Sequence, residues 1–240
     1  MISFAQRLET ISHDLLDLFF PPRCVVCRHV GDWFCAACRQ TVDRILPPVC
    51  NQCGRPRFHR DCPYCEKLPL QIDGTRATAF FEGNLRVAIH AFKYDQRREL
   101  AKPLGKLLCD YLSAHPLPAD AIIPVPLHAE RERARGYNQS TLLAQELGRA
   151  QRLPVWADGL TRTRATRPQI ELDARQRREN VHDAFAATSQ VAGKQILLID
   201  DVCTTGATME ACGVALKARG AQSVWGLAVA RPRNNISKEG

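Results

Sequence analysis

The hydrophobic and polar positions predict an α/β protein from Thr75 onward. Four stretches are largely apolar without strict alternation, which is typical of strands buried on both faces. These predicted strands are TRATAFFEG (residues 75–83), AIIPVPL (121–127), KQILLIDDV (194–202) and SVWGLAVA (223–230). Helical spacing separates them, at residues 85–94, 100–112, 138–150 and 206–220. This alternation predicts a parallel sheet flanked by helices, and VWADGLTRT (155–163) adds a short further strand.

The first seventy residues have a different pattern. Residues 3–19 carry apolar side chains at helical spacing and predict an amphipathic helix. Residues 22–70 are rich in Cys, Pro, Arg and Gly and lack apolar periodicity, so this segment needs a metal or a covalent cross-link to fold. The expected organisation is an N-terminal helix at 1–21, a cysteine-rich domain at 22–70 and an α/β domain at 71–240.

Eight of the eleven cysteines fall into four C-x-x-C pairs. The first cluster is Cys24, Cys27, Cys35 and Cys38, and the second is Cys50, Cys53, Cys62 and Cys65. Each pair supplies half of a tetrahedral zinc site, and a complete set of four thiolates leaves no position for a substrate. The clusters therefore predict one or two structural zinc ions. The knuckles pair either in sequence order or interleaved, and redox catalysis by one pair would leave the other three unexplained.

Charge and targeting signals narrow the class of protein. The formal charge of +8 favours anionic partners such as phosphates, nucleic acid or acidic lipid. Glu9, Asp14 and Asp17 interrupt the segment in which a signal peptide would need an apolar run. The sequence contains no apolar stretch of about 18 residues that would span a bilayer. We therefore expect a cytoplasmic protein whose paired thiols are reduced and bind metal.

The stretch ILLIDDVCTTGAT (residues 196–208) carries the most specific chemistry. Asp200 and Asp201 end an apolar strand, where carboxylates are costly to bury without a partner. The small, hydroxylated turn that follows precedes a helix, which makes a phosphate site, and Gly206 lets the backbone approach the phosphate. We expect Thr204 or Thr205 to cap this helix. Because the Walker and Rossmann glycine patterns are absent, a ribose phosphate fits best, with the acids on its hydroxyls or on a divalent cation.

The same 13 residues resemble the phosphoribosyl-pyrophosphate (PRPP) motif of type I phosphoribosyltransferases. The resemblance implies that Asp200 and Asp201 bind the ribose 2′- and 3′-hydroxyls, directly or through magnesium. It implies also that the following turn holds the 5′-phosphate, with Thr204, Thr205, Gly206, Ala207 and Thr208. Together with the cysteine clusters, IHAFKYDQRREL and PVPLHAERERARGYNQS, the motif resembles the ComF family (ComFC- and GntX-like proteins) over nearly the whole chain.

The family resemblance extends to three further segments. PVPLHAERERARGYNQS lies at the position of the pyrophosphate loop, where Arg131 and Arg135 would bind pyrophosphate bidentately and Asn138 would cap the next helix. Residues 161–180 lie at the position of the mobile catalytic loop, in which Gln169 and Arg175 match recurring positions. Lys93 is expected near the ligand's phosphates. Arg133 is either a further pyrophosphate ligand or a solvated charge. Cys203 is expected to be a small buried filler rather than a reactive thiol.

Two functions follow from this resemblance. The first is an enzyme that binds PRPP with magnesium and transfers the phosphoribosyl group to an unidentified acceptor, with Asp200, Asp201 and Arg175 as catalytic residues. It would act in competence or in the use of imported DNA. The alternative is a non-catalytic sensor of PRPP or nucleotides that binds single-stranded DNA and contacts helicase or channel proteins of DNA uptake.

Residues around the cysteine knuckles suggest the DNA interface. Basic side chains there would contact phosphates, and aromatic side chains would stack on bases. The basic residues are Arg23, Arg28, Arg39, Arg55, Arg57 and Arg60, and the stacking candidates are Trp33, Phe34, Phe58 and Tyr64.

Overall fold

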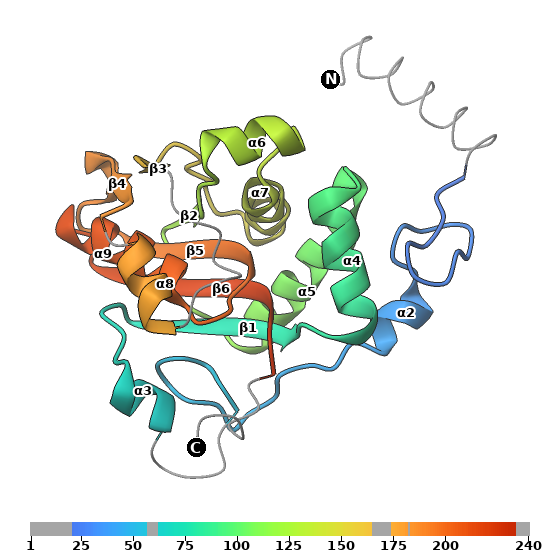
Figure 1. Cartoon of the computed structure of the whole chain (residues 1–240), viewed down its shortest axis with the longest axis horizontal. Coiled ribbons are helices and arrows are strands. Elements are labelled where there is room, and N and C mark those ends of the chain that lie inside the picture. The colour runs from blue at the N-terminus through green and yellow to red at the C-terminus, as the bar shows by residue number, and fades with distance from the viewer. Residues whose placement is uncertain (1–20, 57–61, 165–173, 182, 234–240) are drawn as a thin grey trace.

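A parallel four-stranded sheet forms the centre of the protein (Figure 1). The computed structural model describes residues 21–56, 62–164, 174–181 and 183–233. The strands are β1 (Gly74–Phe80), β2 (Ala121–Pro124), β5 (Gln195–Val202) and β6 (Ser223–Arg231). Their order in the sheet is β1-β6-β5-β2, and every neighbouring pair is parallel. The predicted α/β class and its four strands are therefore confirmed.

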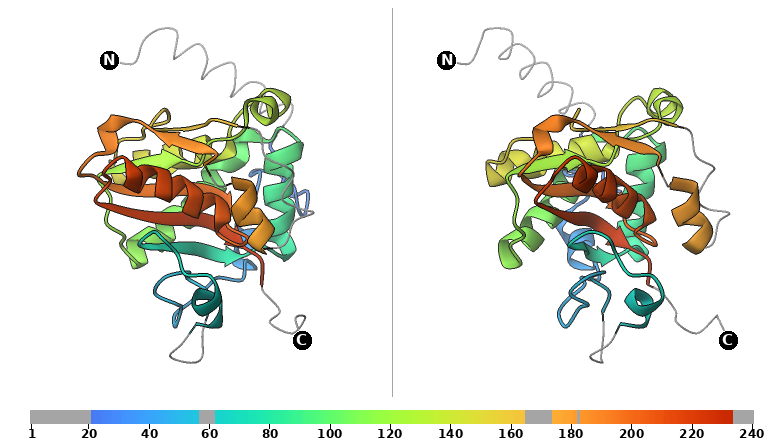
Figure 2. Two further views of the ribbon diagram at one scale, coloured as in Figure 1. Left: turned by 60° about the vertical axis from the view of Figure 1, so that its left-hand side comes forward. Right: turned by 90° about the vertical axis from the view of Figure 1, so that its left-hand side faces the viewer.

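Helices cover both faces of this sheet, as the turned views in Figure 2 show. One face packs on α4 (Gly83–Tyr94), α5 (Ala101–Ala114) and α7 (Gln139–Gln151). The other packs on α9 (Ala207–Ala218) and on a two-stranded antiparallel ribbon of β3 (Leu160–Arg162) and β4 (Phe185–Ala187). Successive residues of β5 point to opposite faces: Leu197 lies in one apolar cluster and Leu198 in the other. Burial on both faces explains why the strand is apolar without alternation.

Several elements differ from the sequence predictions. The helices α6 (Ala129–Arg135) and α8 (Ala174–Val181) form in segments that the sequence predicted to be polar loops. Helix α6 buries none of its side chains, so its sequence has no apolar periodicity. Within 155–163 only β3 is a strand, and it pairs with β4, outside the main sheet. Four short elements complete the described fold: α2 (Ala36–Gln40), α3 (Pro63–Lys67), η1 (Arg98–Leu100) and η3 (Ser189–Val191).

The cysteine-rich segment shares its apolar core with the α/β part of the chain. Phe34 is fully buried in the same cluster as Phe92 of α4, and Ile45 joins the cluster on the opposite face of the sheet. The boundaries proposed at residues 21 and 70 remain predictions, and the amphipathic helix predicted before Pro21 lies outside the described residues. Among the described helices, none is long and apolar enough to cross a membrane.

Candidate ligand site and metal centres

The two acids end the central strand β5, at the carboxyl edge of the sheet. Asp201 is buried and forms an ion pair with Lys93 of α4, with 2.7 Å between Oδ1 and Nζ. The Oδ1 atom of Asp200 accepts hydrogen bonds from Ser140 Oγ at 2.9 Å and from the main-chain N–H of Asp201 at 2.8 Å. These partners offset part of the cost of placing two carboxylates side by side at a buried strand end.

The protonation equilibria of this cluster depend on one another. Burial and the neighbouring charge of Asp201 raise the pKa of Asp200 to about 7, although Lys93 and Ser140 work against this rise. Burial opposes the charge on Lys93, but the Asp201 carboxylate outweighs it and raises the pKa of the lysine. At neutral pH Asp200 is therefore balanced between two protonation states. A cation beside the pair would favour the ionised carboxylate, and carboxylate oxygens are the ligands that Mg²⁺ prefers.

The turn after β5 leads directly into α9. Gly206 is the N-cap and has a φ of 91°, a left-handed conformation that glycine adopts without strain. The expectation of a threonine N-cap was therefore wrong, although Thr205 Oγ1 accepts a hydrogen bond from the Ala207 N–H at 3.3 Å. A Cβ at Gly206 would meet only Cys203 Sγ, at 3.9 Å, so the turn needs glycine for its conformation rather than for space. The N-terminus of α9 directs its dipole toward the turn.

The arginine-rich segment follows β2 at the same edge of the sheet. Helix α6 starts after its N-cap His128 and ends at Gly136 in the left-handed conformation. Arg131 and Arg135 lie one helical turn apart and both line the cavity described next. Arg133 is not part of that lining. Asn138 caps α7, as predicted, by accepting the N–H of Ser140 at 2.9 Å.

The acids, the turn and the arginines surround one cavity of about 690 Å³. Nine residues proposed from the sequence line it: Lys93, Arg131, Arg135, Asp200, Asp201, Thr204, Gly206, Ala207 and Thr208. Thr205 is not in the lining, and its carbonyl is bonded elsewhere. In α/β sheets ligands bind outside the carboxyl ends of the strands, where neighbouring strands continue into helices on opposite faces. Here β5 continues into α9, and β2 continues through α6 into α7 on the opposite face, so the cavity has this location.

The structure adds residues that the sequence did not single out. Ser140 lies within the quoted arginine-rich motif but was not assigned a role, and Phe81 and His90 bring aromatic rings to the cavity. Arg162 of β3, which the sequence placed in the expected catalytic loop at residues 161–180, also lines the cavity, and burial lowers the pKa of this arginine. Of the residues expected in the catalytic loop, Gln169 lies outside the described residues, as does the side chain of Arg175, whose backbone belongs to α8.

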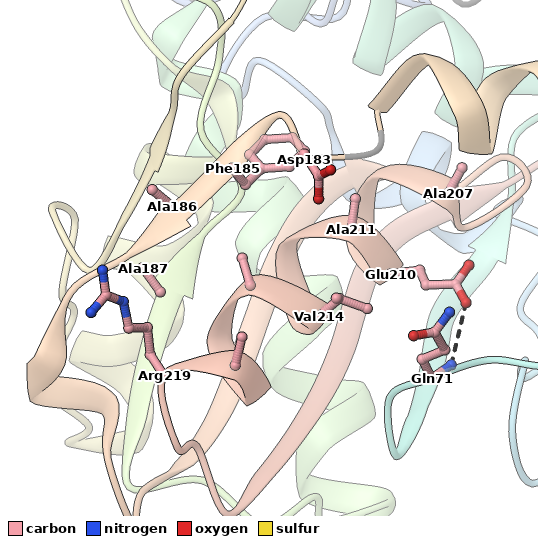
Figure 3. Close-up of a pocket in the computed structure, with 12 residues that line it drawn as sticks. Gln71, Asp183, Phe185, Ala186, Ala187, Ala207, Glu210, Ala211, Val214 and Arg219 are labelled. Carbon is pink, nitrogen blue, oxygen red and sulfur yellow. Dashed lines mark hydrogen bonds between the residues drawn. The ribbon is translucent and has the colours of Figure 1, made fainter.

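A second cavity, of about 380 Å³, runs along the outer side of α9 (Figure 3). Small side chains such as Ala211 and Ala215 line it, together with Val214 and Phe185. Figure 3 shows Glu210 beside this cavity, where its carboxylate accepts the main-chain N–H of Gln71 at 3.2 Å. Of the proposed ligand residues only Ala207 reaches it, so we place the candidate ligand site in the larger cavity.

The two cysteine clusters form two separate sets of four thiols. Within each set the sulfur atoms lie within 4.8 Å of one another, and the knuckles pair in sequence order. Individual separations are 3.5 Å for Cys27–Cys35, 3.7 Å for Cys50–Cys65 and 3.6 Å for Cys53–Cys62. A tetrahedron with Zn–S bonds of 2.3 Å has edges of about 3.8 Å. The sulfur positions therefore fit two structural zinc ions.

The thiols within each set differ in how readily they ionise. Burial opposes ionisation of Cys24 and Cys53, but backbone N–H groups, and Arg55 for Cys53, lower their pKa values to about 6 and about 7. Burial and the neighbouring thiols raise the pKa values of Cys38 and Cys65. Each set thus contains a thiol with a lowered pKa, Cys24 or Cys53, and one with a raised pKa, Cys38 or Cys65. A zinc ion bound by the set would favour the thiolate form.

Basic side chains surround the second cluster. Arg231 is fully buried at the end of β6, and its guanidinium donates to the carbonyl of Cys53 and to Cys203 Sγ. Arg76 donates to the carbonyls of Asn51 and Gln52. A zinc ion with four thiolates carries a net double negative charge, so the buried Arg231 and the half-buried Arg76 are suitable counter-charges.

The second cluster also contacts the turn between β5 and α9. Between its second and third cysteines, Arg55 donates to the Thr204 carbonyl at 3.3 Å. Between its third and fourth, the Tyr64 hydroxyl donates to the Thr205 carbonyl at 2.6 Å. The Arg55 guanidinium stacks 3.5 Å above the centre of the Tyr64 ring.

The surroundings of the aromatic residues determine which of them are free to stack on DNA bases. Phe34 is fully buried in the core, so its assignment as a DNA-stacking residue was wrong. Arg97 covers the ring of Trp33 with its guanidinium 4.9 Å from the ring centre, and Tyr64 is occupied by Arg55 and Thr205. Phe58, Arg57, Arg60 and His59 lie outside the described residues.

Comparisons with known protein families give two matches. Residues 15–69 match the double zinc ribbon domain, and residues 142–237 match the phosphoribosyl transferase domain. The DNA utilization protein YhgH of Escherichia coli O157:H7 is 36% identical over 219 residues, covering 86% of this chain and 96% of that protein. Competence protein F of Haemophilus influenzae is 32% identical over 226 residues, covering 88% and 98%. ComFC of Bacillus subtilis is 27% identical over 194 residues, covering 78% of each chain.

Similar solved structures are more distant. An allosteric regulatory enzyme of purine biosynthesis has a TM-score of 0.41 and 20% identity over 57% of this chain and 29% of its own. Adenine phosphoribosyl transferase from Trypanosoma brucei has a TM-score of 0.33 and 12% identity over 76% and 88%. Because these scores are low, the fold is assigned from the parallel sheet and the family matches.

The chain contains a cysteine-rich zinc-ribbon region followed by an α/β fold of the phosphoribosyltransferase type. The level of identity and the coverage of the relatives then define the family. This protein belongs to the ComF/YhgH family of competence and DNA-utilization proteins.

Proposed function

We propose that the large cavity binds PRPP with magnesium and that the protein transfers the phosphoribosyl group to an acceptor. The observation that carries this proposal is the grouping of a carboxylate pair, a helix N-terminus and two arginines around one cavity. Each group suits one part of PRPP. The acids suit the ribose hydroxyls, the N-terminus of α9 suits the 5′-phosphate, and Arg131 and Arg135 suit pyrophosphate.

Asp200 and Asp201 would hold magnesium together with PRPP, and the ion would supply positive charge that offsets the charge of the pyrophosphate group. The residues of the chain would do the remaining work. Asp200 and Asp201 would hold and orient the ribose, and Lys93 would keep the pair from carrying its full negative charge. Arg131, Arg135 and Arg162 would stabilise the charge that grows on pyrophosphate as it leaves. The catalytic role assigned to Arg175 remains a prediction.

The transfer step forms one bond and breaks one. A lone pair of the acceptor forms a bond to the anomeric carbon of the ribose, and the bond from that carbon to pyrophosphate oxygen breaks. The electron pair of the broken bond leaves with pyrophosphate. The acceptor's proton passes to the departing pyrophosphate or to water. Because no strong nucleophile is needed from the protein, orientation and electrostatics supply the rate enhancement.

A second candidate is a PRPP or nucleotide sensor without turnover. The names of the relatives, which refer to competence and to DNA utilization, support a role for either function in the handling of imported DNA. A role for single-stranded DNA and for helicase or channel partners remains part of this second candidate. Arg23 and Arg28 beside the first cluster favour it through their positive charge.

Calorimetric titration with PRPP, with and without magnesium, tests ligand binding. Asp200→Asn and Asp201→Asn should each weaken binding, whereas the exposed Asp158→Asn, away from the cavity, should not. Release of pyrophosphate with purine or pyrimidine acceptors then separates the enzyme from the sensor. Binding without release under any acceptor supports the sensor, and absence of PRPP binding contradicts both the enzyme and a sensor of PRPP.

A further inference from the structure

Three aromatic rings form a continuous wall of the large cavity. Phe81 follows β1 directly, and His90 and Tyr94 lie on α4. The ring centres are 5.8 Å apart for Phe81 and His90, which stack with an interplanar angle of 18°. His90 and Tyr94 are 5.6 Å apart with an angle of 55°. We call these three residues the aromatic wall.

The wall is open to solvent, unlike most aromatic side chains of the protein. Tyr94 is 62% exposed and His90 is also exposed, whereas Phe92, between them on α4, is fully buried. Among the described Phe, Tyr and Trp side chains, Tyr94 is the one that is more exposed than buried. Arg135 of α6 lies with its guanidinium 5.3 Å from the centre of the Tyr94 ring. Tyr94 and His90 leave ring surface exposed to solvent, and exposed aromatic surface favours a further planar partner.

The position of the wall relative to the acids is fixed by Lys93. His90, Lys93 and Tyr94 are spaced i, i+3 and i+4, so they share one side of α4. Lys93 reaches Asp201 at 2.7 Å. A ribose held by Asp200 and Asp201 would therefore have the aromatic wall as its neighbour on the α4 side of the cavity.

We propose that the aromatic wall binds the planar base of the acceptor, and of the nucleotide that forms from it, which makes the acceptor a nucleobase. This inference rests on the proposed function and deepens it. Stacking on aromatic rings recognises any base through its face. The side-chain amide of Gln96, which also lines the cavity, offers both a donor and an acceptor to a base edge. An ammonia or carboxylate acceptor would use neither feature.

The test compares ligands with and without a base. Calorimetry in the presence of magnesium would measure ribose 5-phosphate, adenosine 5′-monophosphate and uridine 5′-monophosphate. Stacking of one base contributes about 5- to 150-fold in affinity, so both nucleotides should bind more tightly than ribose 5-phosphate by a factor in this range. His90→Ala and Tyr94→Ala should remove most of this gain and leave the affinity for ribose 5-phosphate unchanged.

The chain offers a matched control on α5. Tyr111 and His115 form the same i, i+4 ring pair, with centres 4.9 Å apart, but neither lines the cavity. His115→Ala should therefore preserve the gain. If ribose 5-phosphate binds and the nucleotides bind no more tightly, or if the gain survives in His90→Ala and Tyr94→Ala, the aromatic wall is not the base site and the proposed function stands. If none of the three compounds and no PRPP binds, the proposed function fails and this inference fails with it.

Discussion

The hydroxyl of Tyr64 donates a hydrogen bond to the carbonyl of Thr205 across 141 positions of the chain, at 2.6 Å. Tyr64 lies between two cysteines of the second cluster, and Thr205 lies in the turn proposed to hold phosphate. Arg55 makes the parallel contact to Thr204. Glu210, in the first turn of α9, receives the N–H of Gln71, which follows the same cluster. Residues within and directly after the second cysteine cluster thus form hydrogen bonds to the proposed phosphate turn and to the first turn of α9.

Tyr64→Phe should weaken binding of ribose 5-phosphate. The substitution keeps the ring under Arg55 and removes one hydrogen bond, whose net worth of about 0.5–1.5 kcal/mol corresponds to roughly two- to tenfold in affinity. Calorimetry checks the affinity, and thermal unfolding checks that the fold is kept. Tyr111→Phe on α5 is the matched control. Equal affinities for the wild type and Tyr64→Phe would show that the turn does not depend on this contact.

The two metal centres should affect ligand binding unequally. Cys62→Ser and Cys27→Ser each remove one thiolate from a set of four, in the second and the first cluster respectively. We expect each variant to lose zinc, and only Cys62→Ser to lose much of its affinity for PRPP, because only the second cluster contacts the turn. Elemental analysis and calorimetry on the same samples measure both quantities. Similar affinities in the two variants would contradict the coupling.

Binding of magnesium with PRPP should strengthen as the pH rises through about 7. The folded protein raises the pKa of Asp200 from 3.8 to about 7, so below that pH the carboxyl is protonated and a poor cation ligand. Titrations between about pH 5.5 and 8.5 should show an affinity gain of up to about tenfold per unit below pH 7. Asp200→Asn should flatten this profile, and an unchanged slope in the variant would assign the pH dependence to another group.

The same pKa shift predicts how stability varies with pH when no ligand is present. Between about pH 4 and 7 the folded protein binds more protons at Asp200 than the unfolded chain does, so this residue makes the free energy of unfolding fall as the pH rises. Thermal unfolding at several pH values measures the trend. In Asp200→Asn the free energy of unfolding should fall less steeply as the pH rises. A steeper fall in the variant would show that the pKa of Asp200 is lowered, rather than raised, on folding.

Lys93→Met should destabilise the ligand-free protein. It leaves Asp201 buried beside Asp200 without its ion-pair partner. Breaking a buried pair costs about 3–5 kcal/mol, and we expect the lower end of that range because Lys93 retains some contact with solvent. Denaturant unfolding measures the loss. The double variant Lys93→Met with Asp201→Asn should lose less than the sum of the single variants, and strict additivity would contradict the pair.

The sequence predicted the features that depend on local pattern. Apolar runs located the four strands, and the spacing of the cysteines located both thiol sets. The acid pair and Gly206 were found because strand, acids and turn are consecutive. The contacts of Tyr64 and Arg55 were missed because they join residues 141 and 149 positions apart. The aromatic wall was missed for a related reason, since Phe81 meets His90 only after α4 folds back beside β1.

Arg231 also has a consequence for how the protein is made. The sheet's first strand in the chain, β1, is paired with its last, β6, and Arg231 at the end of β6 reaches the carbonyl of Cys53. During synthesis the cysteine-rich segment therefore emerges long before the strand and the counter-charge against which it docks. Such late, long-range closure slows folding and prolongs the exposure of apolar surface. Early metal capture by the nascent chain would protect this segment until the final strand arrives.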